Sequence, residues 1–355
     1  MKRLFLVLLA IFILAGCSKP QTTGEIVSEQ TVEPSSAPLV TPSPSPPLVT
    51  PSPSPTLPPD DLTAQNGEYT IAWISDTQYY SRSFPEIYYE MTDFLVNEKD
   101  RLNLKYIVHT GDLVHNADVA EQWDVAIKAQ STIEDIPNGV LAGNHDVFHE
   151  DADYSVFYEH FGAEKYSMKP YYAETFKNNR GHADVIDIGD TQYLFVYMGY
   201  IQTEESLKWL DGVFKKYPER YGVLVLHDYI TNEGTYSQDG QKIFDEVVSK
   251  NPNVKMVLCG HRYVFANIST KLDDDGDGNA DRTVYEILGN YQAAGDMGGS
   301  GFMRFLKVNE NEGKIYMYSY SPYLDEYVYY DEPQRMEEKY STPAELETAV
   351  FDFKK

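Results

Sequence analysis

The sequence has 355 residues, and its 55 acidic side chains outnumber its 29 basic ones, which gives a formal net charge of −26. A charge this negative argues against nucleic acid as a partner, because proteins that bind a phosphate backbone need a basic surface. It leaves a phosphorylated substrate open, since a bound metal ion can dominate the charge of a single pocket.

The amino terminus has the pattern of a bacterial export signal. Met1-Lys2-Arg3 is basic, residues 4–14 are apolar, and Leu14-Ala15-Gly16-Cys17 resembles a lipobox. This pattern predicts a signal peptide over residues 1–16 and a diacylated Cys17, and an ordinary signal peptide with an incidental cysteine is the alternative. The lipoprotein interpretation places the protein at the bacterial cell membrane, anchored only through lipid and facing the extracytoplasmic side.

Residues 17–62 have the composition of an extended linker. The nonapeptide Pro-Leu-Val-Thr-Pro-Ser-Pro-Ser-Pro occurs twice in tandem, at 38–46 and 47–55. Alternating prolines form neither helix nor central strand, because proline lacks an amide donor and fixes φ. We expect the segment to be disordered and rich in polyproline II, and to hold the following domain away from the membrane.

Short apolar runs alternate with amphipathic stretches over residues 63–322, which we assign to one domain. We expect strands at 69–75, 104–109, 140–142, 185–188, 193–198, 221–226 and 254–258, and a run of strands over 263–320. We expect helices at 85–101, 119–132, 154–161, 204–217 and 241–250. Residues 163–181 have no clear period and are predicted to form an active-site loop. This order predicts an α/β fold, α+β in part, with two packed mixed sheets flanked by helices.

Five polar clusters follow directly after predicted strands. They are Asp76-Thr77-Gln78, Gly111-Asp112, Gly143-Asn144-His145-Asp146, His227 and Gly260-His261. Strands of an α/β sheet build their sites at the carboxyl edge, so these side chains are expected to converge there. Carboxylates, amides and imidazoles bind hard and borderline metal ions. One carboxylate shared by two cations is the arrangement used in two-metal hydrolysis of phosphate esters.

The order and context of these motifs resemble the calcineurin-like metallophosphoesterases, over essentially all of residues 68–322. The resemblance is closest to a bacterial branch whose first motif is Asp-Thr-Gln. It implies a four-layer sandwich and two divalent or trivalent transition metals, iron, manganese or zinc. It also implies a role for each motif residue. Asp112 would bridge the metals, Asp76 with Gln78 nearby would bind the first, and the second would be held by Asn144, His227 and His261.

The same resemblance implies two catalytic residues. His145 would face the substrate and stabilise or protonate the leaving oxygen, and Asp146 would orient the imidazole of His145.

Two positions depart from the usual pattern of this family. Gln78 stands where the family often has histidine, and Tyr263 stands where the second histidine of Gly-His-x-His would bind the first metal. A tyrosinate at position 263 would bind iron; otherwise the first site is weakened or lost. His115, three residues after Asp112, is a candidate replacement ligand, and a surface histidine at the start of a loop is the alternative.

Two further features are visible in the sequence. The segment Asp273-Asp274-Asp275-Gly276-Asp277-Gly278-Asn279-Ala280-Asp281 matches part of a calcium loop, with candidate ligands Asp273, Asp275, Asp277 and Asp281. An acidic turn in a β-hairpin explains it equally well. The 29 tyrosines cluster at 79–89, 154–172 and 316–330. Half-buried packing explains most of them, and a stacking platform for carbohydrate or base is the alternative.

We therefore expect a metal-dependent hydrolase that cleaves a phosphate monoester or diester by in-line attack of a metal-activated water. Its substrate would be a phosphorylated small molecule or a component of the cell envelope. A catalytically degenerate fold that acts as an envelope-binding module is the alternative. The Tyr- and Glu-rich extension over residues 323–355 has no function legible in the sequence, which also leaves the oligomeric state undetermined.

Overall fold

The computed structural model describes residues 62–148 and 152–353. These residues belong to the second of two units, Met1–Thr50 and Pro51–Lys355, into which the chain divides. The predicted signal peptide, Cys17 and almost all of the predicted linker lie outside the described residues. Within the described ranges, no helix has the length and apolar character needed to cross a lipid bilayer.

The first sheet is built around parallel strands from the start of the domain. Its order is β13-β12-β11-β1-β2-β3, and β14 also pairs with β12. The strands β1 and β2 are parallel, as are β2 and β3, whereas β11 runs antiparallel to β1. Their bounds are β1 Glu68–Ile74, β2 Leu104–His109, β3 Asn138–Val140, β11 Met303–Asn309, β12 Lys314–Ser321, β13 Glu326–Tyr327 and β14 Ala349–Asp352.

The second sheet has the order β4-β5-β6-β7-β8-β10-β9. The strands β6, β7, β8 and β10 are mutually parallel, and antiparallel strands close both edges. Their bounds are β4 Tyr172–Phe176, β5 Gly181–Ile188, β6 Thr191–Met198, β7 Tyr221–Leu226, β8 Val254–Cys259, β9 Phe265–Leu272 and β10 Arg282–Gly289. The strands predicted at 185–188 and 193–198 are confirmed within β5 and β6, which pair in antiparallel orientation.

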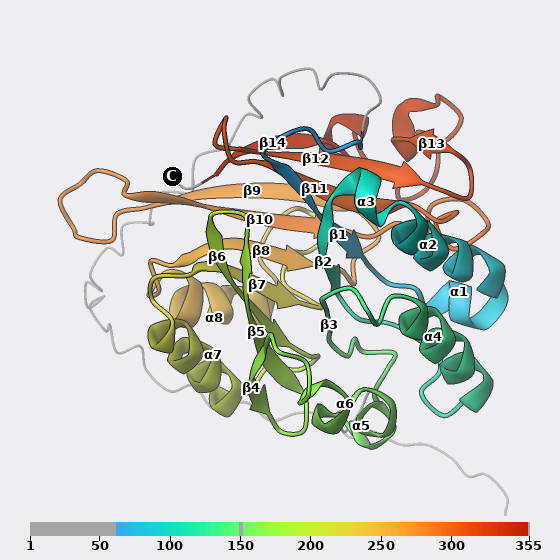
Figure 1. Cartoon of the computed structure of the whole chain (residues 1–355), viewed down its shortest axis with the longest axis horizontal. Helices are drawn as coiled ribbons and strands as arrows, with labels where there is room; N and C mark the ends of the chain where they lie inside the picture. The colour runs from blue at the N-terminus through green and yellow to red at the C-terminus, as the bar shows by residue number, and fades with distance from the viewer. Residues whose placement is uncertain (1–61, 149–151, 354–355) are drawn as a thin grey trace, which may run out of the picture. The chain divides into compact units, whose positions relative to one another are not determined.

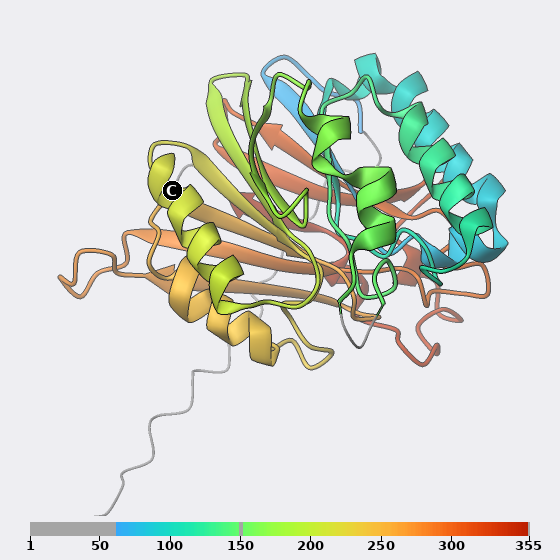
Figure 2. The ribbon, with the colours of Figure 1, turned by 90° about the horizontal axis from the view of Figure 1, so that it is seen from below.

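Helices cover the outer faces of both sheets (Figures 1 and 2). The first sheet is covered by α1 Gln78–Ser83, α2 Pro85–Asn97, α3 Lys99–Leu102, α4 Ala120–Thr132, α5 Ser155–Phe161 and α6 Ala163–Tyr166. The second is covered by α7 Glu204–Lys216 and by α8 Gln238–Ile243, which continues as a π-helical turn over Phe244–Val248. The predicted four-layer sandwich with mixed sheets is confirmed.

The alternation of side chains along β1 shows how the layers are held. Ile71 and Trp73 point into the core between the sheets, whereas Ala72 and Ile74 point into the core beneath the helices. Successive residues of a strand face opposite sides, so a strand buried on both faces reads as a continuous apolar run. All seven residues of β1 are buried.

Several predicted elements are wrong in detail, for physical reasons. The helix expected over 85–101 ends at Asn97. A separate helical turn, α3, ends at Leu102 and is followed by Asn103 in a left-handed conformation. The short helix α1 was not predicted, because its sequence is polar and aromatic with no apolar period. The stretch 163–181 is not an active-site loop. It contains α6 and the edge strand β4, whose alternating exposure gives a weak apolar signal.

The C-terminal extension is continuous with the domain. The strand β13 pairs with the end of β12, and β14 pairs with its beginning. The buried carboxylate of Glu347 accepts hydrogen bonds from the backbone amides of Tyr329 and Tyr330 and from the hydroxyl of Tyr291. The extension therefore packs against the residues that follow β10.

Candidate metal centre

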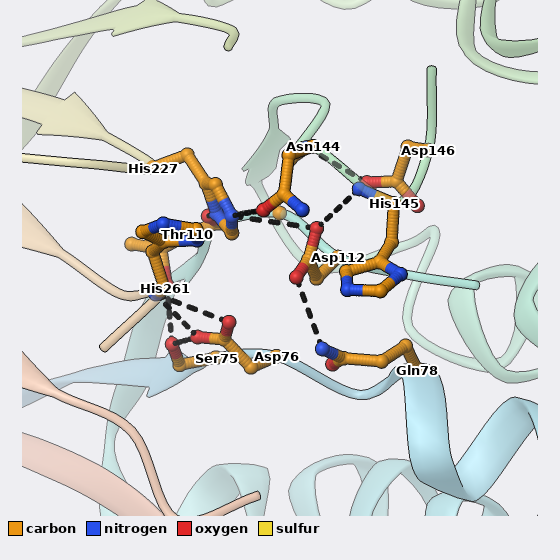
Figure 3. Close-up of polar contacts among 12 residues, drawn as sticks. Ser75, Asp76, Gln78, Thr110, Asp112, Asn144, His145, Asp146, His227 and His261 are labelled. Atoms are coloured by element: carbon orange, nitrogen blue, oxygen red, sulfur yellow. Dashed lines mark hydrogen bonds and ion pairs between the residues drawn. The ribbon is translucent and has the colours of Figure 1, made fainter. Parts of the chain in front are cut away.

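The loops after β1, β2, β3, β7 and β8 meet at one edge of the two sheets (Figure 3). Hydrogen bonds join the sheets there. The backbone amide of His261 donates to both carboxylate oxygens of Asp76 at 3.1 Å, and Nδ1 of His227 donates to the carbonyl of Thr110 at 2.9 Å. The five polar clusters of the sequence therefore lie together.

Asp112 is at the centre of the contacts. Its Oδ2 accepts a hydrogen bond from Nε2 of Gln78 at 3.0 Å, and its Oδ1 accepts one from the backbone amide of His145 at 2.9 Å. The Oδ1 atom also lies 3.3 Å from Nε2 of His227. Burial acts to raise the pKa of Asp112, but the charges and hydrogen bonds of His227 and His145 together hold that pKa at about 2. Asp112 is therefore an ionised carboxylate enclosed by the domain.

His227 is surrounded by oxygen atoms. Its Nδ1 faces the Thr110 carbonyl, and its Nε2 lies 2.9 Å from Oδ1 of Asn144 as well as near Asp112. Burial acts to lower the pKa of His227, but Asp112, Asp76 and the Thr110 carbonyl together raise that pKa to about 10, so the ring carries a proton on Nε2 near pH 7 when no ion is bound. With that proton displaced and Nδ1 still protonated, three lone pairs would converge at Nε2, from His227, Asn144 and Asp112. A cation satisfies that arrangement.

Asp76 is held by a chain of hydroxyl groups. Ser75 donates to Oδ2 of Asp76, Thr110 donates to Ser75 at 2.8 Å, and the indole of Trp73 donates to Thr110 at 3.2 Å. Burial raises the pKa of Asp76 to about 7. The carboxylate is thus fixed in orientation and desolvated, which favours a nearby positive charge.

His261 completes a group of donors around Asp112. Ligand atoms of Asp112, His227 and His261 all lie within 4.8 Å of one another. Burial, followed by the charge of His227, lowers the pKa of His261 to about 3. Its imidazole is therefore neutral near pH 7, which is the form that binds a metal.

The backbone at the site is strained. Asp76, Asp112 and His261 have φ angles of 52°, 56° and 70°. Non-glycine residues in this left-handed region cost of order 1–3 kcal/mol each and cluster at functional sites. Gly143 and Gly260 leave room for the ligands, because a Cβ at Gly143 would overlap Asp112 and a Cβ at Gly260 would overlap Asp76.

The two predicted catalytic residues lie at the site with different partners from those expected. Asp146 is fully buried, and its two oxygens accept the backbone amides of Val114 and Gly143 at 2.9 and 2.8 Å. The Nδ1 atom of His145 lies 2.8 Å from the carbonyl oxygen of His115. The carbonyl of His115 thus takes the position predicted for the Asp146 carboxylate, and Asp146 instead ties the third motif to the loop after β2.

The two candidate replacement ligands face aromatic neighbours. The ring of His115 stacks on the ring of His145, with centroids 4.9 Å apart and planes 20° apart. Tyr263 lies edge-on against Tyr340, with centroids 5.0 Å apart. Burial raises the pKa of Tyr263 to about 12, and the charges of Asp112 and Asp76 add to this increase. Metal binding by His115 or Tyr263 stays a prediction.

The donors fit a metal ion on two observations. Ionised carboxylate, neutral imidazole and amide oxygen converge within a few ångströms, which is a suitable set for iron, manganese or zinc. In addition, Oε1 of Gln78 is buried without a hydrogen-bond partner among the described residues. A buried amide oxygen without a partner is costly, and coordination of a cation would remove that cost.

Sequence reasoning missed several residues that contact the site. The ring centroid of Tyr200 lies 6.2 Å from that of His227 and 6.3 Å from that of His261. Asp228 follows His227 and forms an ion pair with Arg262 at 3.4 Å. The signal for Tyr200 was present, since Gly199-Tyr200 follows β6 at the same edge as the recognised motifs.

The acidic segment between β9 and β10 forms an exposed hairpin turn. Ligand atoms of Asp273, Asp275 and Asp281 lie within 4.8 Å of one another, whereas Asp277 accepts a hydrogen bond from the backbone of Asn279. The oxygens of Asp273 also accept amides of the turn. Both interpretations of this segment, calcium loop and acidic turn, are compatible with these contacts.

The comparisons with known sequences point to one family. The family described as calcineurin-like phosphoesterase matches residues 69–265. An uncharacterised protein of Bacillus subtilis (strain 168), YvnB, is 41% identical over 274 residues, which cover 77% of this chain and 21% of that protein. The chain thus spans about a fifth of the length of this relative.

The solved structures to which the chain is similar have low sequence identity. Purple acid phosphatase PPD1 from yellow lupin is 11% identical, with a TM-score of 0.49 over 78% of this chain and 56% of that one. GAP50, the anchor in the inner membrane complex of Plasmodium, is 13% identical, with a TM-score of 0.46 over 81% of this chain and 90% of that one. NAD nucleotidase of Haemophilus influenzae is 11% identical, with a TM-score of 0.42 over 72% and 48%.

Proposed function

The chain belongs to the calcineurin-like phosphoesterase family, and from this premise we propose that it is a metal-dependent hydrolase of phosphate monoesters or diesters. The observation that carries the proposal is the convergence of Asp112, His227 and His261 within 4.8 Å at the carboxyl ends of the strands. A dinuclear centre would be held by Asp76, Gln78, Asp112, Asn144, His227 and His261.

The chemistry of the bound ions fits this reaction class. Iron, manganese or zinc would supply positive charge for the phosphoryl oxygens and would make water nucleophilic near neutral pH. The protein's own part is to fix the ligands before the substrate arrives. Ser75 and Thr110 orient Asp76, and Gln78 together with the His145 amide orients Asp112. Hydrogen bonds of this kind hold the side chains that coordinate a metal in the right orientation, and so they determine how tightly the metal is bound.

His145 is placed to handle the proton of the leaving group. A carbonyl oxygen can only accept a hydrogen bond, so Nδ1 of His145 carries a proton toward His115. The opposite ring atom, Nε2, is then the one that exchanges a proton with the substrate. In the imidazolium form, Nε2 donates to the departing oxygen and prevents a buildup of negative charge there.

Asp146 supports this geometry without contacting the substrate. Its buried carboxylate binds the amides of Val114 and Gly143, so it links the two loops that carry Asp112 and His145. We assign it a positioning role.

A non-catalytic envelope-binding module is the second candidate, and one observation favours it. Tyr263 occupies the position of a first-metal ligand, and its ring packs against Tyr340. If the first metal needs a histidine at position 263 to be held, this protein lacks a complete metal centre. It would then bind an envelope component without hydrolysing it.

We further propose that the enzyme acts outside the cytoplasm as a lipid-anchored protein. The support is the sequence around Cys17 and the Pro-rich segment that follows it. A substrate from the cell envelope or a phosphorylated small molecule suits this location.

The test is hydrolysis of p-nitrophenyl phosphate and bis(p-nitrophenyl) phosphate by the purified protein after loading with manganese, iron or zinc. The proposal expects metal-dependent turnover of at least one of the two esters by the wild-type protein. Turnover that appears only in a Tyr263→His variant would support the binding module instead. A wild-type protein that is inactive with every metal would also contradict the proposed enzyme.

A further inference from the structure

The metal centre is bordered by aromatic side chains that the reaction itself does not require. The rings of Tyr263 and Tyr340 pack edge to face, with centroids 5.0 Å apart. The ring centroid of Tyr79 lies 5.4 Å from that of His115, and the ring of His115 stacks on that of His145. All four of the residues Tyr79, His115, Tyr263 and Tyr340 are half-buried, so each keeps part of its surface open to solvent. The stack of His115 on His145 joins Tyr79 to the third motif of the metal centre.

Tyr340 reaches the site because the C-terminal extension is firmly packed beside it. A ring cluster joins the start of β9, the Gly-rich stretch over residues 290–302 between β10 and β11, and the extension; its members are Phe265, Tyr291, Phe302, Tyr329 and Tyr330. Glu338, two residues before Tyr340, accepts hydrogen bonds from the amide of Gly295 and the hydroxyl of Tyr329. The backbone that leads to Tyr340 is thus tied both to Gly295 and to Tyr329.

Tyr79 is positioned from the opposite direction. It is the second residue of α1, directly after Gln78. Gly298 packs against its Cβ, because a Cβ added at Gly298 would lie 2.8 Å from that atom. The Gly-rich stretch therefore contacts the base of Tyr79 as well as the segment that carries Tyr340.

Basic side chains lie over the rings of Tyr79 and Tyr340. The guanidinium of Arg82 lies 4.7 Å from the ring centroid of Tyr79, and the ammonium of Lys339 lies 4.6 Å from that of Tyr340. Arg82 and Lys339 thus each place a positive charge beside one of these tyrosines, in a chain whose net charge is −26.

We propose that Tyr79, Tyr263 and Tyr340 form a subsite for a ring in the organic group of the substrate. Tyrosine presents a rigid flat face at low conformational cost, and both nucleobases and sugar rings offer a matching face. The substrate class is therefore a phosphate ester whose organic group carries a ring. Tyr263 then contacts the substrate, which accounts for tyrosine at a position where the family uses a metal ligand. This inference rests on the proposed phosphoesterase activity.

The test compares three esters of similar primary alcohols: a nucleoside 5′-monophosphate, ribose 5-phosphate and glycerol 3-phosphate. If the wild-type protein hydrolyses only diesters, the same three groups are used as p-nitrophenyl diesters. Because the leaving alcohols are alike, differences in kcat/KM report recognition of the organic group. We expect a higher kcat/KM for a ring-bearing ester than for the glycerol ester, and the first two substrates distinguish a base from a sugar.

Variants at position 340 assign that preference to the subsite. In Tyr340→Ala, the ratio of kcat/KM for the preferred ring ester to that for the glycerol ester should fall roughly tenfold, as loss of one stacking ring typically does. Tyr340→Phe should keep the wild-type ratio, because it keeps the ring. Tyr327→Ala is the matched control in the same extension, since Tyr327 packs on Tyr320 in the first sheet.

Two outcomes would overturn the inference and can be told apart. If the wild-type protein hydrolyses all three esters equally, or Tyr340→Ala keeps the wild-type ratio, the subsite is wrong and the phosphoesterase stands. If no ester is hydrolysed, including p-nitrophenyl phosphate and its bis-ester, the proposed function fails and the subsite fails with it.

Discussion

The domain buries histidine beside aspartate in two places. At the carboxyl edge of the strands, His227 lies 3.3 Å from Asp112. On β5, between the sheets, His182 lies 3.8 Å from Asp184. All four side chains are almost completely buried. Burial and residue type alone therefore do not distinguish the two pairs.

The neighbours of each pair distinguish them. His182 is surrounded by aromatic rings: the ring centroids of Tyr197 and Tyr172 lie 4.3 and 5.5 Å from that of His182, and both rings stack on it. The hydroxyl of Tyr106 donates a hydrogen bond to Asp184. Burial lowers the pKa of His182 to about 3 and raises that of Asp184 well above its usual value, so burial favours the neutral form of both groups.

Around His227, in contrast, the oxygens of Asn144 and Asp112 converge at Nε2, the Thr110 carbonyl holds Nδ1, and Asp112 stays ionised. Several lone pairs directed at one point are the sign of a cation site, whereas a neutral pair among rings is part of the core. The contrast gives matched substitutions that change the same residue type in both places.

The largest expected effect comes from Asp112→Asn. The change removes the one carboxylate that contacts Gln78, His145 and His227 together. We expect phosphoesterase activity to fall by more than the roughly 100-fold that loss of one outer contact to a metal ligand causes. Asp184→Asn is the control and should retain wild-type turnover, and equal losses in the two variants would contradict the contrast.

A smaller loss is expected from Gly143→Ala. The added Cβ would overlap Asp112 and approach His227, so these ligands must shift. Activity and metal affinity should fall about 10–100-fold. Gly212→Ala is the matched control, because a Cβ there meets nothing within 4 Å. Within helix α7 the control should raise the free energy of unfolding by up to about 1 kcal/mol and leave kcat unchanged.

Removal of the metal should lower stability only where the His227–Asp112 pair is intact, because the ion binds at that pair and not at His182–Asp184. A chelator should lower the Tm of the wild-type protein, and metal returned at about 100 times its Kd should restore roughly 2.7 kcal/mol. Asp184→Asn should respond in the same way, whereas Asp112→Asn should show little change in Tm. A wild-type Tm that is insensitive to chelator and to added metal would speak against a bound ion.

The smallest expected effect is a change with pH in the stability that the His182–Asp184 pair contributes. Burial raises the pKa of Asp184, partly offset by the hydrogen bond from Tyr106, so the folded protein retains a proton that the unfolded chain releases above about pH 4. Stability from this group is therefore present below the unfolded pKa and is lost as pH rises.

Asp184→Asn cannot release that proton. Thermal unfolding of this variant and of the wild-type protein should occur at similar temperatures near pH 4, and the variant should gain a few degrees by pH 7. An advantage that shrinks with rising pH would show that Asp184 is ionised in the folded state.

The sequence predicted the elements whose signal is local. The apolar runs that form β1, β2, β7 and β8 were assigned within one residue at each end, because strands buried on both faces need no partner to be recognised. The polar residues at their ends then placed the metal centre.

Features that depend on tertiary contacts were not predictable. The contact between the His115 carbonyl and His145, and the binding of backbone amides by Asp146, depend on how two loops pack. The contact of Tyr340 with Tyr263 joins residues far apart in the sequence, through an extension that has no apolar period.

The most direct test of the central claim is the transition-metal content of three purified proteins: wild type, Asp112→Asn and Asp184→Asn. Each would be supplied with iron, manganese and zinc and then freed of unbound ions. The account predicts about two tightly bound ions per chain in the wild-type protein and in Asp184→Asn, and a clear loss in Asp112→Asn. A wild-type protein without bound metal, or an Asp112→Asn protein with the wild-type content, would contradict it.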